Sequence, residues 1–176
     1  MRYRRVIIPG ACYFFTVNLH DRKSKLLTEN IDELRLAFRK TMQHYPFSIE
    51  AVVVLPEHLH LIMTLPENDG NYSLRWNCIK GIFSKQIPHH ETPLHARKDK
   101  RERGIWQKRF WERLIRDDVD FEPHVNYIHY NPVKHGYVAS PVEWRYSSIH
   151  RFIQKGIVSN RWGCNQELNS LSFGER

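Results

Sequence analysis

Two apolar runs separated by a Pro-Glu dipeptide constrain the fold of this chain more than any other feature. Together they read SIEAVVVLPEHLHLIMTL. Short runs rich in β-branched and aliphatic residues are typical of strands, so we predict strands at 48–55 and 58–65, joined by a tight connection. The second run also carries His58 and His60, and a buried polar side chain without a partner costs about 2–7 kcal/mol. These two histidines must therefore face partners.

The rest of the chain supplies the other elements of a mixed helix and strand fold. Aromatic and β-branched runs predict strands, and apolar residues three or four apart predict helices that bury one face. Pro132 should stop the last helix, because proline lacks the N–H that a helix needs. In chain order we predict a strand at 11–19, a helix at 28–44, the two strands above, a helix at 73–87, a strand at 110–116 and a helix at 118–131.

The order β-α-β-β-α-β matches the split βαβ plan of ferredoxin-like folds. We therefore expect an α+β domain with an antiparallel sheet and an extra helix, carrying Tyr127, beside that sheet. The domain should span residues 1–150, and residues 151–176 should form a C-terminal tail that packs on the domain or covers it. A chain of 176 residues can bury such a core without disulfides.

The charge of the chain indicates the kind of partner that it binds. The formal net charge is +8 and the pI is about 9.5, and a basic surface on a small domain favours polyanions, nucleic acid above all. Three widely spaced cysteines form no CxxC pair, which favours reduced thiols in the cytoplasm. No run of about 18 apolar residues occurs, so we expect no membrane-spanning helix.

The two histidines are spaced to form half of a metal site. Positions i and i+2 of a strand point to the same face, so His58 and His60 should lie side by side while Leu59 enters the core. The alternative is a pair of histidines hydrogen-bonded to backbone or to acids. A metal that does chemistry also needs a third protein ligand and open positions for substrate.

A second stretch, HVNYIHYNPVKHG at residues 124–136, supplies a candidate for that third ligand. Tyr127 and Asn131 are four residues apart, so they share one face of a helix. An amide oxygen can bind Mg²⁺ or Mn²⁺, and a tyrosine is an oxygen nucleophile that can form a covalent intermediate. The alternative is that the tyrosines fill a core and that Asn131-Pro132 ends a helix.

Four stretches of the chain together resemble one family. They are VVLPEHLHLIMTLPE, IWQKRFWERLIRD, HVNYIHYNPVKHGYV and VEWRYSS, in this order. His-Leu-His on a strand, followed by a helical tyrosine, resembles the single-tyrosine HUH transposases. The ordered set resembles more closely the REP-associated tyrosine transposases, which are linked to bacterial repetitive extragenic palindromes. The similarity extends from the first strand to about residue 150.

The resemblance implies a role for each matching position. His58 and His60 would ligate a divalent metal, Mg²⁺ or Mn²⁺, and Asn131 would be a third, amide-type ligand. Tyr127 would be the nucleophile. Tyr130 is a rival, but it lies three residues from Tyr127 and next to Asn131, so we expect it to face another direction. The stretch ARKDKRERG matches no motif of the family.

The resemblance also implies the reaction. The protein would cleave and rejoin single-stranded DNA at hairpins of these palindromes, leaving a 5′-phosphotyrosine and a free 3′-OH. The metal would offset the negative charge that develops on the phosphate. Rejoining would need no ATP, because the phosphodiester's energy stays in the covalent link. The absence of a GxxxxGK[ST] motif agrees with this.

Basic residues interleaved with aromatic ones are candidates for DNA contact. In WQKRFWER, rings can stack on unpaired bases while cations meet phosphates. At least two of Trp106, Phe110 and Trp111 should instead fill the core. The candidate DNA-binding residues are Arg2, Arg4, Arg5, Lys23, Lys108, Arg109 and Arg113.

Two other function classes remain open. One is a non-catalytic, domesticated module that binds hairpin DNA on the same fold, since one fold serves many functions. The other is a histidine-pair phosphoesterase, which uses two separated HxT or HxS motifs where this chain has one HxH. We further expect a monomer whose site is built in cis, because the tyrosine helix has a short connection. It should act in the bacterial cytoplasm, at the nucleoid.

Overall fold

The computed structural model describes residues 7–88 and 103–164. The predicted α+β order is confirmed, although the first predicted helix is split into a single turn and a longer helix. The elements are β1 (Cys12–Asn18), α1 (Leu26–Glu29), α2 (Ile31–His44), β2 (Ser48–Val54), β3 (His58–Thr64), α3 (Tyr72–Gln86), β4 (Trp111–Ile115), α4 (Asp118–Lys134), the 3-10 turn η2 (Pro141–Glu143) and α5 (Ile149–Gln154).

The four strands form one antiparallel sheet in the order β2-β3-β1-β4. β3 and β1 are therefore the central strands, and β2 and β4 lie at the edges. In the register between the central strands, Thr16 pairs with His60 and Asn18 pairs with His58. The histidine pair thus lies on a strand that is hydrogen-bonded on both sides.

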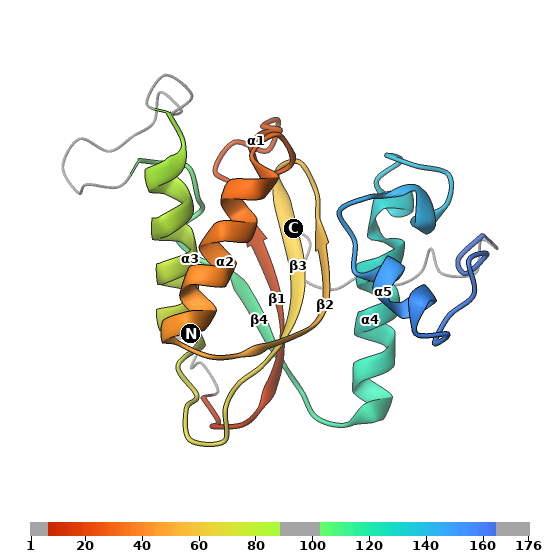
Figure 1. Cartoon of the computed structure of the whole chain (residues 1–176), viewed down its shortest axis with the longest axis horizontal. Coiled ribbons are helices and arrows are strands. Elements are labelled where there is room, and N and C mark those ends of the chain that lie inside the picture. Colours follow the sequence, from red (N-terminus) through yellow and green to blue (C-terminus); the bar gives the residue numbers. More distant parts are fainter. Residues whose placement is uncertain (1–6, 89–102, 165–176) are drawn as a thin grey trace, which may run out of the picture.

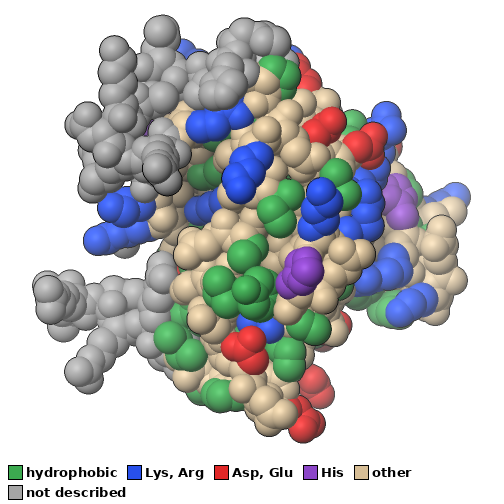
Figure 2. All heavy atoms as spheres, turned by 60° about the vertical axis from the view of Figure 1, so that its left-hand side comes forward, with side chains coloured by type: hydrophobic (Ala, Val, Ile, Leu, Met, Phe, Trp, Pro, Cys, Tyr) green, Lys and Arg blue, Asp and Glu red, His purple; other side chains and the backbone are tan. Residues whose placement is uncertain are grey.

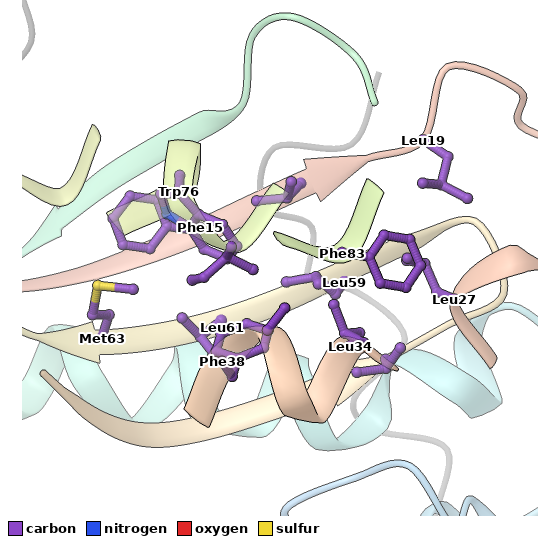
Figure 3. Packing of buried hydrophobic residues seen from close by; sticks show 14 of the residues in the cluster. Phe15, Leu19, Leu27, Leu34, Phe38, Leu59, Leu61, Met63, Trp76 and Phe83 are labelled. Atoms are coloured by element: carbon purple, nitrogen blue, oxygen red, sulfur yellow. The ribbon is translucent and has the colours of Figure 1, made fainter. Parts of the chain in front are cut away.

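Helices cover both faces of this sheet (Figure 1). α2 and α3 lie on one face, and α4 and α5 lie on the other. Alternation along β3 divides its side chains between the two faces, as a strand requires. Leu59, Leu61 and Met63 join the larger core cluster with Phe38 and Trp76 of α2 and α3 (Figure 3).

A smaller core cluster lies between the sheet and α4. It contains Phe14 and Ile62 from the central strands and Tyr127 and Ile128 from α4. The residues after α4 pack on both α4 and strand β2. The Ser148 N–H donates to the Val52 carbonyl at 2.8 Å, and the His129 ring lies 4.6 Å from that of Phe152 and 5.9 Å from that of Trp162, centroid to centroid. The predicted division of the chain at residue 150 stays a prediction.

The expectation that Pro132 would stop the last helix is wrong. α4 continues through it to Lys134. Proline removes only its own N–H, and the helix keeps its next bond, from the His135 N–H to the Asn131 carbonyl at 3.0 Å. The helix ends at Lys134, two residues before Gly136, whose φ of +72° is the left-handed conformation that glycine adopts most easily.

Two bonds at Gly136 complete a Schellman motif. The Gly136 N–H donates to the Val133 carbonyl and the Tyr137 N–H donates to the Pro132 carbonyl, both at 2.9 Å. At the other end, Asp117 caps the helix by accepting the Asp120 N–H at 2.8 Å. Both ends of α4 are therefore fixed by local bonds. Within the described ranges, no helix is long and apolar enough to cross a bilayer.

Candidate active site

His58 and His60 lie side by side on the face of the sheet that α4 covers. Both are completely buried, and their ring centroids are 4.9 Å apart. The side-by-side arrangement follows from the strand alternation. The burial follows from their place on a central strand beneath a helix.

One ring nitrogen of each histidine has a partner. The Nδ1 of His60 lies 2.9 Å from the Oγ1 of Thr16, and the Nδ1 of His58 lies 2.8 Å from the Oε1 of Glu57. A carboxylate only accepts, so the Nδ1 of His58 carries the proton and its Nε2 keeps a lone pair. That Nε2 is buried and has no hydrogen-bond partner among the residues that the structure describes. Metal-binding histidines are held in this way by a second partner.

Glu57 is itself held in place by two neighbours. The Tyr137 hydroxyl donates to its Oε2 at 3.3 Å, and an Arg22 nitrogen lies 3.7 Å from its Oε1. Burial raises the pKa of Glu57, but its bonds and charge interactions, chiefly with His58, outweigh burial and leave that pKa below its ordinary value. Burial lowers the pKa of His58 and outweighs the opposing effect of Glu57. The pair is therefore a carboxylate beside a neutral imidazole, the form that can ligate.

α4 presents a row of side chains to the histidines. The Tyr127 ring lies 5.1 Å from that of His60, and the His135 ring lies 5.2 Å from that of His58, measured between centroids. Asn131 is four residues from each of these two helical positions, and it is completely buried. Residues four apart share a helix face, so Asn131 lies on the face of α4 that carries Tyr127.

Tyr127 is enclosed by aromatic and basic groups. It is 1% exposed, and its ring lies 5.9 Å from that of Phe14. The Lys134 Nζ lies 4.8 Å from the centre of the Tyr127 ring. Tyr130, the rival nucleophile, packs near Gly163 instead. A Cβ atom added at Gly163 would lie 3.4 Å from the Tyr130 ring. Only Tyr127 of these two tyrosines thus contacts a histidine of the pair.

The donor set can be compared with the needs of a divalent metal. Among the described residues, no group of three His, Cys, Asp or Glu side chains could hold a metal ion. A metal at the pair would need a ligand of another type, and Asn131, on the helix face that carries Tyr127, has an amide oxygen of suitable chemistry. Two imidazoles and an amide oxygen fit a divalent ion with positions open for substrate.

Comparisons with known proteins show the family to which this chain belongs. Residues 10–131 match the family described as Transposase IS200 like. The chain is 44% identical over 174 residues to the REP-associated tyrosine transposase of Escherichia coli, covering 99% of this chain and 96% of the relative. The chain belongs to the REP-associated tyrosine transposases.

Two further relatives extend the match. One is a Haemophilus influenzae protein named "Putative REP-associated tyrosine transposase". It is 48% identical over 167 residues, which cover 94% of this chain and 95% of that protein. A solved REP-associated tyrosine transposase, bound to a REP hairpin, superposes with a TM-score of 0.85 at 43% identity. That match covers 100% of this chain and 98% of the other.

One predicted DNA-binding cation of the transposase follows a residue that contacts Glu57. Lys23 is exposed in the loop after β1, next to Arg22, which reaches Glu57. Arg2, Arg4 and Arg5 lie outside the described residues. Most of the charged stretch at 88–104 lies outside them as well.

The remaining predicted cations lie at the β4 edge of the sheet. Lys108 and Arg109 are exposed just before β4. Arg113 pairs with Phe14 in the register, which puts it on the α4 face, where it forms an ion pair of 3.0 Å with Asp120. Its charge is thus shared with an acid of the transposase itself.

The expectation for the aromatic residues of this segment is confirmed. Trp106 and Phe110 pack against the larger core cluster, whereas Trp111 is 36% exposed. Two of the three therefore pack on the core, as predicted, although each is only partly buried. Trp111 remains at the surface.

Four residues around the site were not predicted: Thr16, Glu57, Lys134 and His135. Glu57 precedes His58 in the chain, and that adjacency was a usable signal. His135 is at i+8 from Tyr127, and the same stripe would have reached it if the helix had been extended past Pro132. Thr16 carried no signal, because only the strand register places it opposite His60.

Proposed function

We propose that this transposase is a metal-dependent endonuclease and strand transferase that cleaves and rejoins single-stranded DNA through Tyr127. The contact between Tyr127 and His60, at 5.1 Å between ring centroids, carries the proposal because it joins a nucleophile to a candidate metal ligand within one chain. The geometry supports a monomer with its site in cis.

In the proposed reaction, the Tyr127 oxygen attacks the scissile phosphorus and the phenol loses its proton. The bond from phosphorus to the 3′ oxygen breaks, and that oxygen takes up a proton as the free 3′-OH. A 5′-phosphotyrosine remains on the enzyme. Attack by a 3′-OH reverses these steps and restores the phenol, so the number of phosphodiester bonds is conserved.

Three side chains would hold the metal, Mg²⁺ or Mn²⁺: His58 and His60 through Nε2, and Asn131 through its amide oxygen. When bound, the ion would polarise a nonbridging phosphate oxygen and offset its developing charge. The protein's own task is to fix the imidazoles in the ligating tautomer. The Glu57 carboxylate does this for His58, and the Thr16 hydroxyl would do it for His60 by accepting the Nδ1 proton. Lys134 adds a positive charge near the attacking ring.

The proposed substrate is hairpin DNA of repetitive extragenic palindromes, with adjoining single strand. The solved relative binds a REP hairpin, and the net charge of +8 suits a polyanion. The site residues are buried, so the phosphodiester can reach them only when the atoms around them move. The proposed place of action is the bacterial nucleoid.

The test is a covalent adduct. Wild type, Tyr127→Phe and Tyr130→Phe are incubated with a labelled single strand that contains the palindrome, plus Mn²⁺, and run on a denaturing gel. We expect a protein-linked DNA band from wild type and Tyr130→Phe and none from Tyr127→Phe. The reversed pattern would move the nucleophile to Tyr130, and no band from wild type on any palindromic strand would favour the non-catalytic binding module.

A second variant separates cleavage from binding. Replacing both His58 and His60 with alanine should abolish the adduct while hairpin affinity changes little, because that affinity rests on phosphate contacts elsewhere. Cleavage at the wild-type rate by this double variant would remove the histidines from the mechanism.

A further inference from the structure

A cavity of about 490 Å³ lies between α3 and the segment that leads to β4. It is within the range of about 300–1,000 Å³ that is usual for ligand sites. Trp106 and Phe110 form part of its wall. They pack on Phe83 and Phe15, at 5.4 Å and 5.8 Å between ring centroids, so the cavity belongs to the α2 and α3 side of the sheet. Tyr127 lies on the other side.

The lining of the cavity is positively charged. Four basic residues line it, and none of the described lining residues is an aspartate or a glutamate: the four are Lys80, Lys85, Arg103 and Lys108. Arg103 donates to carbonyls at the end of α3. Lys85 and Lys108 are exposed, and Figure 2, which turns the α3 side forward, shows Lys and Arg side chains over its upper half. The cavity therefore suits an anion.

The aromatic wall narrows the class of anion. The Lys80 Nζ lies 5.7 Å and 5.4 Å from the ring centres of Trp106 and Phe110, and it donates to the Gln107 carbonyl at 3.0 Å. The Nε1 of Trp106 is buried and has no hydrogen-bond partner among the described residues. Rings and cations together are the groups that hold an unpaired nucleotide.

Gly81 gives the cavity one open side. It lies in the middle of α3, where glycine costs about 1 kcal/mol relative to alanine. A Cβ added there would meet nothing within 4 Å, so packing within the protein does not require glycine. Bare backbone at this point lets a ligand approach the helix closely.

A continuous basic route connects the cavity to the active-site face. Lys108 lines the cavity, Arg109 follows it, and edge strand β4 begins two residues later. Trp111, which is 36% exposed, pairs with Thr16 and thus lies on the α4 face. A strand that leaves the active site can pass around this edge.

We propose that this cavity, the Gly81 pocket, binds unpaired nucleotides of the DNA strand that extends beyond the hairpin. The phosphate meets Lys85 and Lys108, and the base lies against Trp106 and the open helix surface at Gly81. The inference rests on the proposed function for the identity of the DNA. The contact is independent of base sequence, because its partners are charges, rings and backbone.

Fluorescence anisotropy without metal tests this pocket. A labelled hairpin is compared with the same hairpin extended by about ten thymidines, a length within the ~4–16 nucleotides of known single-strand sites. Wild type should bind the extended DNA at least about fivefold more tightly than the bare hairpin. This is the gain expected when one base stacks on an aromatic ring. Gly81→Glu, which fills and recharges the pocket, should lose this gain and keep its affinity for the bare hairpin. Gly81→Ala should keep both.

Salt dependence tests the phosphate contact. Lys85→Gln should lower the log-log salt slope by about one for the extended DNA and not for the bare hairpin. Lys40→Gln is the matched control, because it removes one charge from the exposed surface of α2. It should not lower the slope for the extended DNA more than the slope for the bare hairpin. The proposed nucleotide site is refuted if the thymidines do not raise the affinity of wild type for the DNA. It is also refuted if Gly81→Glu keeps the full gain in affinity that the thymidines give to wild type. Because no metal or cleavage is involved, a missing covalent adduct would count against the proposed function alone.

Discussion

Replacing Thr16 with valine should weaken metal binding at the histidine pair while the sheet stays intact. Thr16 is 1% exposed, it pairs with His60 in the register, and its Oγ1 lies 2.9 Å from the His60 Nδ1. Valine has the same branched shape and suits a strand equally well, but it offers the imidazole no acceptor. The change therefore isolates one hydrogen bond.

Two magnitudes follow from this geometry. A buried imidazole N–H without its acceptor costs about 1–3 kcal/mol in the free energy of unfolding. Loss of an outer partner of a metal-binding histidine lowers metal affinity about 10–100-fold. Thr16→Ser is the matched control, because it keeps the hydroxyl and loses one methyl group, worth about 0.8 kcal/mol of stability.

The measurements are a calorimetric titration with Mn²⁺ and urea unfolding, on wild type and both variants. We expect Thr16→Val to lose both affinity and stability, and Thr16→Ser to lose stability only. If wild type binds Mn²⁺ and Thr16→Val binds it equally tightly, then this hydrogen bond does not set the tautomer of His60, and the reasoning is wrong.

Three more predictions concern the surroundings of the site. Glu57→Gln keeps an acceptor for His58 but removes the charge, so Mn²⁺ affinity should fall about tenfold in the same titration, and unchanged affinity would refute the charge argument. Gly136→Ala should cost about 1–2 kcal/mol in urea unfolding, since φ is +72° and no clash is added. Burial lowers the pKa of His124 below its ordinary value of 6.5. As the pH falls through 6.5, the unfolded chain therefore takes up a proton at this histidine before the folded chain does. The free energy of unfolding then falls with pH. His124→Gln should show a smaller fall between about pH 7 and about pH 5, and an equal fall would assign the effect to other groups.

Strand alternation made part of the site predictable from sequence. His58 and His60 had to share a face, and Leu59 had to enter the core, because side chains alternate along any strand. The pairing of Tyr127 with Asn131 followed in the same way from the helical repeat. These relations are local, so a short stretch of sequence contains them.

The groups that tune the site depend on long-range pairing. Thr16 and His60 are 44 residues apart, and Arg22 and Tyr137 reach Glu57 from opposite ends of the domain. No local pattern encodes such contacts. The extent of α4 does not follow from Pro132 alone, because a backbone bond from His135 to Asn131 carries the helix past the proline.

The two halves of the site differ in how firmly they are held. His58 and His60 lie on a central strand, hydrogen-bonded on both sides, and moving them would break the sheet. α4 carries Tyr127 and Asn131 on a helix that meets the sheet through side chains, including the ion pair between Asp120 and Arg113 of β4. Opening the buried site at α4 therefore breaks packing contacts, whereas opening it at β3 also breaks backbone hydrogen bonds. Because the least stable contacts open first, the phosphodiester should enter between α4 and the sheet, with the histidines as the fixed half and the tyrosine as the half that adjusts.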